Sequence, residues 1–394
     1  MVAQLTVTAA DFTLDLTLAA RRAGWYADSE LGPVVLGYRA ARDLMTDPRL
    51  VQSGLGLLDR HGIVDGPVYR WFVPIILHRG GADHARLRSL ARRAFSPRMV
   101  DAARGFIRAT ATTLAEDMVT GGDFVARFAD QLPLAVICHL LGVPADDIAG
   151  VTQCTRDIGR IYDLSWGPDT YTRIERGLLG LYGHIDAAIA RRTDEPGDDL
   201  ISALLAARAD GGRLDDEELR SLVVATAFAG HDTTRCQLGQ AMAVLCADPR
   251  LWSRISDDPS RAALAAEEII RLAPAAPMVY RFATTDIDYQ DLRIPAKSLV
   301  LLCTYAAHRD PAVFDRPDVI DLDQRRTAAT LTFGAGAHHC LGAEVARAEL
   351  TETITALTGR FGPPAVTSEP TWRSPLGIFG PDVLPVRFAA PAPA

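Results

Sequence analysis

The chain has 394 residues, of which 48% are hydrophobic and 23% charged, a composition that supplies a large buried core and excludes a disordered protein. Its formal net charge of −8 leaves no basic field that would hold a nucleic acid or an anionic membrane. We therefore expect a globular protein without polyanionic partners.

The N-terminal segment and the cysteines indicate a cytosolic protein. Residues 1–24 mix Asp11, Asp15, Arg21 and Arg22 with apolar residues, so they form neither a signal-peptide core nor a membrane-spanning helix. The six cysteines lie in apolar stretches without paired spacing, which favours a reducing compartment over a disulfide framework. We expect five of them to pack as small apolar side chains and treat Cys340 separately.

In chain order, the apolar spacing predicts a mainly α protein with a small β portion. The predicted strands cover residues 34–38, 286–294, 299–304 and 383–388. The predicted helices cover residues 102–118, 130–141, 176–192, 199–209, 217–248, 261–272 and 343–361. Asp199, and Asp215 or Asp216, are suitable helix N-caps. Because no repeat or low-complexity linker interrupts this order, we expect one domain over residues 1–394 with an Ala/Pro tail after Phe388.

Two stretches, residues 54–77 and 158–171, are rich in large apolar side chains but lack clear periodicity. They are either irregular loops that close over an apolar ligand or loops that pack on the core. Composition alone does not decide between these alternatives.

The predicted helix 217–248 carries polar groups in an apolar setting. Residues 222–229 are apolar, so this part of the helix is expected to be buried. Asp232 and Thr233 follow directly, and an unpaired buried carboxylate would cost several kcal/mol, so Asp232 needs a partner or water. The Thr233 hydroxyl can bond the Ala229 carbonyl, bending the helix and opening a groove at Gly230.

A glycine-rich loop, Phe333-Gly-Ala-Gly-Ala-His-His-Cys340-Leu-Gly342, leads directly into the last predicted helix. Its three glycines allow tight turns and close approach to a flat cofactor. A free cysteine has a pKa of about 8.5, and amide N–H groups, the helix N-terminus and a metal ion would each favour its thiolate. The loop therefore suits Cys340 to metal ligation.

Two other interpretations of this loop remain at this point. His338, His339 and Cys340 are all potential zinc ligands, but consecutive residues rarely converge on one tetrahedral ion. Alternatively, Cys340 is an unremarkable cysteine at the start of a helix.

The loop resembles the haem-binding signature of the cytochrome P-450 family, Phe-Gly-x-Gly-x-His-x-Cys-x-Gly, and matches it at every fixed position. The resemblance implies the cytochrome P-450 fold and a haem b cofactor. Cys340 would be the axial ligand of the iron, and Phe333 would lie beside the sulfur. The remaining haem contacts implied are Gly334, His338 with a propionate, Gly342 and, on the long helix, Ala229. His339 inherits no role.

Glu268 and Arg271 lie three residues apart in the predicted helix 261–272, so their side chains share one face. An exposed pair at this spacing would contribute at most about 1 kcal/mol. The sequence resembles the Glu-x-x-Arg element of the family, which would make the pair a structural brace for the cysteine loop. Either Arg325 or Arg326 would complete this brace.

Further family motifs imply haem contacts and proton delivery. His84 and Arg88 resemble the His-x-x-x-Arg motif, and Arg281 resembles the late Arg-x-Ala motif; all three would bind the propionates, although solvated cations are the ordinary alternative. Asp232 and Thr233 resemble the Ala-Gly-x-(Asp/Glu)-Thr motif, which implies that they are catalytic residues managing the protons needed to split dioxygen.

The implied activity is a monooxygenase that inserts one oxygen atom from O2 into a small lipophilic natural product or xenobiotic. Electrons would come from NAD(P)H through a separate ferredoxin and ferredoxin reductase, and the protein would be a monomer. By analogy Arg86, Arg92, Arg93 and Arg98 would form a basic docking cluster for an acidic ferredoxin. A peroxide-driven peroxygenase and a non-catalytic haem or lipid carrier are the alternatives.

Analogy also suggests which residues contact the substrate, although each could be ordinary apolar packing. They are Val68, Trp71, Phe72, Tyr162, Trp166, Phe228, Met278, Val279, Ile378 and Phe379. Two departures from the family pattern concern local loop shape: residues 79–83 lack the usual prolines, and His308 replaces a common asparagine.

Overall fold

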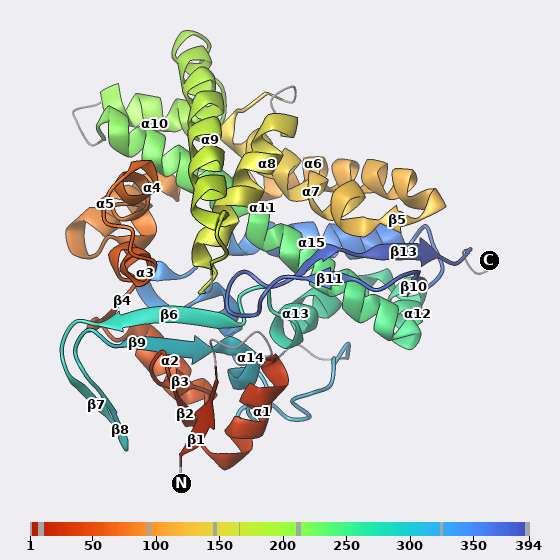
Figure 1. The fold of residues 1–394 in the computed structure, drawn as a ribbon. Coiled ribbons are helices and arrows are strands. Elements are labelled where there is room, and N and C mark those ends of the chain that lie inside the picture. The colour runs from red at the N-terminus through yellow and green to blue at the C-terminus, as the bar shows by residue number, and fades with distance from the viewer. Residues whose placement is uncertain are drawn as a thin grey trace.

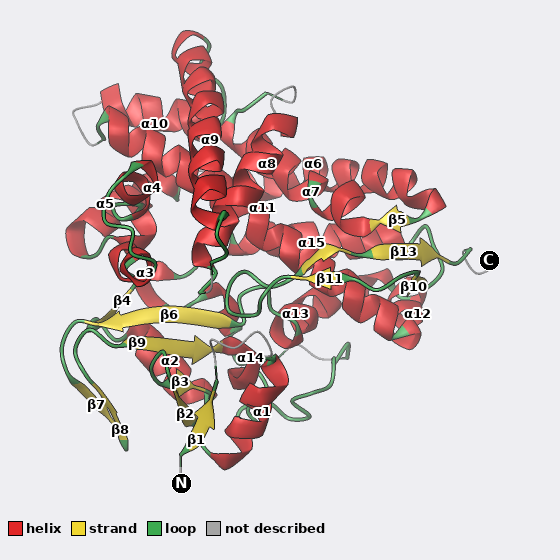
Figure 2. Cartoon of the chain, viewed as in Figure 1, coloured by secondary structure: helices red, strands yellow, loops and turns green. Residues whose placement is uncertain are grey.

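The computed structural model describes residues 2–6, 12–92, 95, 97–144, 148–164, 166–209, 214–323 and 326–390. Helices make up most of this part of the chain (Figures 1 and 2). The α-helices are α1 Leu14–Ala23, α2 Tyr38–Thr46, α3 Gly54–Arg60, α4 Pro67–Phe72, α5 Gly81–Ala91, α6 Pro97–Asp117, α7 Gln131–Leu141, α8 Ile148–Gly159, α9 Thr170–Asp194, α10 Leu200–Ala209, α11 Asp216–Ala247, α12 Pro249–Asp257, α13 Ala262–Leu272, α14 Thr304–Ala307 and α15 Ala343–Thr358.

The strands are short and form separate sheets. The largest sheet has the order β1-β2-β3-β9-β6-β4, and a second has the order β10-β13-β5. The pairs β7-β8 and β11-β12 are antiparallel hairpin-like ribbons. The bounds are β1 Ala3–Leu5, β2 Tyr26–Ser29, β3 Val34–Val35, β4 Leu50–Val51, β5 Gly122–Asp123, β6 Met278–Ala283, β7 Ile287–Tyr289, β8 Leu292–Ile294, β9 Leu299–Cys303, β10 Pro364–Val366, β11 Thr371–Trp372, β12 Pro381–Val383 and β13 Pro385–Phe388.

Helix α11 is the central element, in contact with α7, α8, α9, α13 and α15. Its start is fixed by a capping box in which the Asp215 side chain accepts from the Glu218 N–H at 2.7 Å and the Glu218 carboxylate accepts from the Asp215 N–H. One buried apolar group lies between α11 and the helices α7 to α10, and another joins α11 to α6, α13 and α15. These two groups form separate cores on two sides of α11. Within the described ranges, no helix is long and apolar enough to cross a membrane.

The mainly α prediction with a small β portion is confirmed, and each long predicted helix is present. Asp215 caps α11, and Asp199 accepts from the Ser202 N–H at 2.9 Å at the start of α10. The prediction that residues 54–77 are irregular is wrong, because they contain α3, α4 and the 3₁₀ turn η1 Ile76–His78. The predicted strand 34–38 is also too long, since Tyr38 already begins α2.

Candidate functional site

A cavity of about 340 Å³ lies where α11, the cysteine loop, β6 and the 3₁₀ turn η5 Arg160–Tyr162 meet. Residues 333–334 and 338–342 form one wall, which includes Cys340. Part of α11, from Leu222 to Gln237, forms a second wall, and Tyr162 and residues 75–77 contribute a third. The cavity therefore joins segments that lie far apart in the sequence.

The cysteine loop turns through two left-handed glycines. Gly334 has φ 72° and Gly336 has φ 68°, conformations that residues with a Cβ rarely adopt. The Cys340 N–H donates to the Phe333 carbonyl at 2.8 Å, which closes the loop on itself, and α15 begins three residues later. The Arg347 guanidinium lies over the Phe333 ring at 4.5 Å and holds the loop against α15.

The Cys340 thiol is accessible from the cavity but deep within the protein. Burial raises the pKa of this thiol, while the Gly342 N–H and the charges of Arg88 and Arg347 act in the opposite direction. The predicted amide contribution is therefore present, but the protein groups alone leave the thiol neutral. Deprotonation has to come from binding a metal ion.

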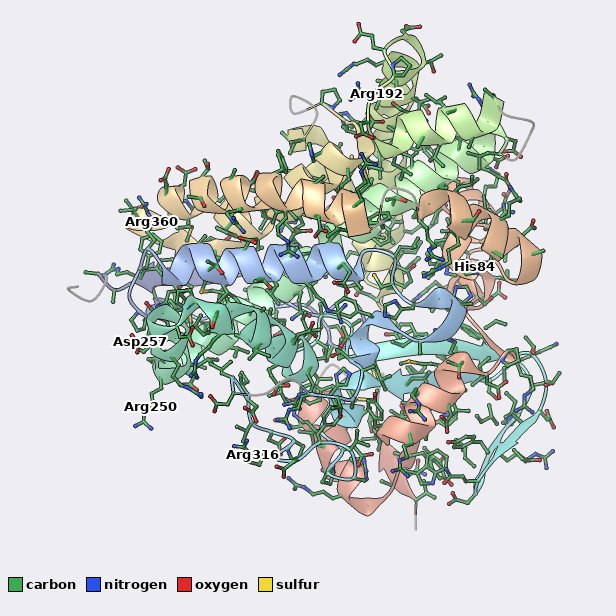
Figure 3. All side chains as sticks on the ribbon, turned by 180° about the vertical axis from the view of Figure 1, so that it is seen from behind. His84, Arg192, Arg250, Asp257, Arg316 and Arg360 are labelled. Atoms are coloured by element: carbon green, nitrogen blue, oxygen red, sulfur yellow. The ribbon has the colours of Figure 1, made fainter. Side chains whose placement is uncertain are left out.

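Four basic side chains gather at one edge of the cavity: His84 and Arg88 from α5, Arg281 from β6 and His338 from the loop. The His84 and His338 rings lie 4.2 Å apart, and Arg88 donates to the His339 carbonyl. Figure 3 labels His84 on α5, beside the loop that precedes α15. Sequence positions separated by more than 250 residues thus converge as the family motifs imply.

Arg281 is 2% exposed, yet among the described residues it has no carboxylate partner. It donates a hydrogen bond to the Tyr280 carbonyl at 2.9 Å, and burial lowers its pKa from the ordinary 12.5 to about 10. A buried, uncompensated cation at the edge of a cavity is a binding site for an anionic group.

The Glu268–Arg271 pair is buried, not exposed. The two side chains form two N–H···O bonds of 2.8 Å, and Arg271 also donates to the His308 carbonyl at 2.9 Å and to the Val319 carbonyl at 2.9 Å. Arg326 donates to Glu268 at 3.3 Å, whereas Arg325 lies outside the described residues. The pair is a structural brace in which Arg326 is the third member.

His308 connects this brace to the cysteine loop, a role that the sequence did not reveal. One ring nitrogen, Nδ1, lies 2.9 Å from the Arg271 carbonyl, and Nε2 accepts from the Leu331 N–H at 2.8 Å. Burial lowers the pKa of His308 to about 3, so the ring is neutral and can make both contacts. The substitution noted in the sequence therefore places a rigid link between α13 and the segment just before Phe333.

On α11, the Thr233 hydroxyl donates to the Ala229 carbonyl at 3.0 Å, as expected, and lines the cavity. At Gly230 a Cβ would come within 2.7 Å of the Ile137 side chain, so the glycine admits α7. Asp232 is fully buried and does not line the cavity. Its carboxylate instead pairs with Arg373 at 2.7 Å and Arg235 at 3.2 Å, which supplies the predicted partner.

Comparison with known proteins identifies the family. A family model described as Cytochrome P-450 matches residues 184–368. Luteothin monooxygenase of Streptomyces thioluteus is 40% identical over 373 residues, 94% of this chain and 92% of that protein. The chain belongs to the cytochrome P-450 family.

Two further similarities extend over nearly all of this P-450. It is 32% identical over 372 residues to 6-deoxyerythronolide B hydroxylase of Saccharopolyspora erythraea, covering 90% of each protein. The crystal structure of CalO2 superposes with a TM-score of 0.89 at 26% identity, covering 98% of this chain and 100% of that one. The protein is therefore a P-450 monooxygenase with a haem-thiolate cofactor.

The residues present fit this cofactor. The cavity brings a cysteine sulfur, a glycine-rich loop and the unpaired Arg281 guanidinium to one space, which are the groups that an iron porphyrin with anionic propionates requires. Ala229, Phe333, Gly334 and Gly342 also line this space.

The residues suggested for substrate contact fall into two groups. Tyr162, Phe228 and Val279 line the cavity. Val68, Trp71 and Phe72 are fully buried one layer behind it, where Trp71 meets the Phe228 ring and Phe72 meets the Tyr162 ring. The others lie away from the cavity lining: Met278 in the core of the large sheet, Ile378 in the helical core, Phe379 beside a separate open groove, and Trp166 stacked on His61 at 3.9 Å.

Proposed function

We propose that this P-450 oxidises a small lipophilic natural product held between Tyr162, Phe228 and Val279. The apolar lining of the cavity supports this proposal. So do the names of two relatives, a luteothin monooxygenase and a 6-deoxyerythronolide B hydroxylase. The single observation that carries the proposal is the placement of Cys340 and Thr233 on different walls of the same cavity.

The bound haem supplies the activation of dioxygen, in which two electrons and two protons deliver one oxygen atom to the substrate and release the other as water. The protein residues have separate tasks. Cys340 would donate the sulfur ligand, and His84, Arg88, Arg281 and His338 would bind the propionates.

Thr233 and Asp232 would manage proton delivery. The Thr233 hydroxyl donates its own hydrogen to the Ala229 carbonyl, so its oxygen is left to accept a hydrogen bond from water in the cavity. Asp232, the residue before Thr233, lies behind the cavity wall and does not face the cavity. Its arginine partners keep the pKa of this buried carboxyl low. Asp232 is therefore a carboxylate near neutrality, and in a relay it would hold a proton only transiently before passing it on.

Tyr162 would orient the substrate. Its ring stacks on Phe228 at 6.0 Å, and no described group forms a hydrogen bond with its hydroxyl. Burial alone raises the pKa of this hydroxyl far above the usual value, which keeps it a neutral donor. A substrate with a carbonyl or ether oxygen at the matching position would satisfy this donor, so we expect a partly conjugated or aromatic substrate that carries such an acceptor.

Electrons would come from NAD(P)H through a ferredoxin reductase and an acidic ferredoxin that docks beside the cysteine loop. Arg92 and Arg98 are exposed there, and Phe95 between them lies 3.9 Å from the Cβ position of Gly342. Arg86 is an unsuitable member of this cluster because it pairs with Glu218 at 2.6 Å. Arg93 lies outside the described residues.

The absorption spectrum of the reduced protein with carbon monoxide tests the haem ligation. We expect the red-shifted Soret band of a thiolate ligand, and its loss in Cys340→Ser. Titration of lipophilic compounds into the ferric protein, followed by turnover with ferredoxin, reductase and NADPH, tests the substrate assignment. Faster turnover with peroxide alone would instead favour the peroxygenase, and binding without product under either condition would favour the carrier.

A further inference from the structure

Residues 273–277, which join α13 to β6 (Figure 1), form part of the cavity wall; we call them the α13–β6 segment. The segment reads Ala-Pro-Ala-Ala-Pro, so two of its five residues have no backbone N–H to donate. Ala275 and Ala276 line the cavity, and Val279 follows them near the start of β6. The position of this segment therefore decides where one side of the cavity lies.

The α13–β6 segment is held in place by hydrogen bonds from other elements. The Phe379 N–H donates to the Ala275 carbonyl at 2.8 Å, and the Thr304 hydroxyl of α14 donates to the Ala276 carbonyl at 2.6 Å. Because buried backbone groups are costly to leave without a partner, these bonds restrict where the segment can lie.

Gln237 of α11 supplies two more bonds from a single side chain. Its Nε2 donates to the Ala273 carbonyl at 2.9 Å, and its Oε1 accepts from the Ala275 N–H at 3.0 Å. Gln237 is 7% exposed and lines the cavity one turn after Thr233. The amide therefore ties the α13–β6 segment to α11 at the cavity itself.

Short side chains line the cavity on both of these elements. They are Ala225, Ala229 and Gly230 on α11, and Ala275 and Ala276 on the α13–β6 segment. Alanine and glycine have no side-chain rotamers, so these parts of the wall cannot adjust to a ligand by rotating a side chain. The width of the cavity here depends on where the two backbones are held, and Gln237 holds one against the other.

We propose that Gln237 is a positioning residue for substrate selection, whose amide fixes the width of the cavity between α11 and the α13–β6 segment. A fixed width admits the flat, partly conjugated substrate proposed above and excludes bulky ones. This inference rests on the proposed function, because it requires lipophilic substrates to occupy this cavity. Gln237 acts through Ala275 and Ala276, since both polar atoms of its amide are already bonded to the segment.

Hydrogen exchange in the ferric, haem-loaded protein tests the tie itself. Gln237→Leu removes both bonds with little change in side-chain volume. In a peptide spanning residues 273–277, the prolines carry no amide hydrogen, so Ala275 and Ala276 report on the segment. We expect the Ala275 N–H to exchange roughly tenfold faster in the variant, the effect of losing one ordinary hydrogen bond.

Gln240→Leu is the matched control. Gln240 is the same residue type three positions further along α11 and is also buried, at 6% exposure. Its amide donates to the Phe379 carbonyl at 3.5 Å, and its side chain lines the separate groove instead of the cavity. This substitution should leave exchange at Ala275 and ligand selection unchanged.

Spectral titration of the ferric protein tests ligand selection. The probes are imidazole, flat 4-phenylimidazole and bulky 1-tritylimidazole, each of which carries a nitrogen that can bind the iron. We expect wild type to bind 4-phenylimidazole most tightly. In Gln237→Leu the ratio of the 1-tritylimidazole Kd to the 4-phenylimidazole Kd should fall roughly tenfold, whereas the Kd of imidazole, which is too small to span the cavity, should not change.

Two further variants give this test a direction. Thr304→Val removes the bond to the Ala276 carbonyl from the other side of the segment, so it should lower the same ratio. Ala276→Val narrows the wall without removing a bond of Gln237, so it should raise the ratio. A loss of stability without a role in selection would not move the ratio in opposite directions.

The outcomes separate this inference from the proposed function. If 4-phenylimidazole binds wild type no more tightly than imidazole does, the cavity does not hold lipophilic ligands, and both fail. If wild type discriminates and Ala276→Val shifts the ratio, but Gln237→Leu exchanges faster at an unchanged ratio, only the inference is overturned. Should Gln237→Leu not fold, Gln237→Glu, which at neutral pH keeps the acceptor and loses the donor, takes its place, and a wild-type ratio in that variant likewise overturns the inference.

Discussion

Replacing Arg281 by methionine should weaken haem retention. When no anion pairs with Arg281, burial lowers its pKa from 12.5 to about 10. At 1.36 kcal/mol per pKa unit, keeping this guanidinium charged in the folded protein costs about 3 kcal/mol of stability. Because the pKa of a base is lowered, this cost is present at every pH below about 10, where the guanidinium is charged, and disappears only above the ordinary value. A haem propionate offsets the cost by supplying the missing anion.

The magnitude follows from the bond that is lost. A hydrogen bond to a charged group contributes about 1.5–3 kcal/mol, which corresponds to a roughly ten- to hundredfold faster loss of haem. The assay is transfer of haem from the holoprotein to excess apomyoglobin, followed by absorbance. Methionine keeps most of the side-chain volume, so packing changes little.

Arg309→Met is the matched control. Burial also lowers the pKa of Arg309, but this arginine donates to the Leu272 carbonyl at 2.7 Å and lines a separate groove. Its replacement should change stability without a selective effect on haem. Equal rates of haem loss from the Arg281→Met and Arg309→Met variants would refute the assignment of Arg281 to a propionate.

Three other substitutions test the brace, the cavity and the packing around the Asp232 carboxylate. Glu268→Gln should lower the free energy of unfolding by about 3–5 kcal/mol in denaturant, because it leaves a buried arginine unpaired. Since the pKa of Glu268 is lowered, its stabilisation is present above the ordinary glutamate pKa and is lost as the pH falls through the folded value; an acid unfolding curve unchanged by the substitution would contradict this. Tyr162→Phe should leave stability within about 0.5 kcal/mol but weaken binding of acceptor-bearing ligands up to about tenfold in spectral titrations, whereas equal affinities would show that the hydroxyl is not used. Gly159→Ala should cost about 1–3 kcal/mol in thermal unfolding, because its Cβ would displace the Asp232 carboxylate, while Gly183→Ala, which has open space, should not.

Local sequence was enough to predict the elements whose apolar spacing, caps or turn glycines lie within one continuous segment. The apolar spacing and the Asp215 capping box define α11, and the glycines before Cys340 predict the turns that the positive φ angles of Gly334 and Gly336 confirm. Elements with a short or interrupted apolar pattern, including α8 and most strands, were not predicted from the sequence. A two-residue strand such as β4 is stabilised by pairing with β6, more than 230 residues away, and leaves no period of its own.

The sequence thus determined the cofactor and the reaction class, whereas the partners of the buried charged side chains were determined by the tertiary structure. The cysteine loop, the long polar-interrupted helix and the Glu-x-x-Arg spacing identified the haem-thiolate family because each is a short motif with fixed spacing. The direction in which Asp232 points was not determined, because Arg373 and Asp382 reach it only when the C-terminal segment folds back against α11. Ion pairs act through space and not along the chain, so a buried carboxylate's partners are known only after packing has brought them within a few ångströms.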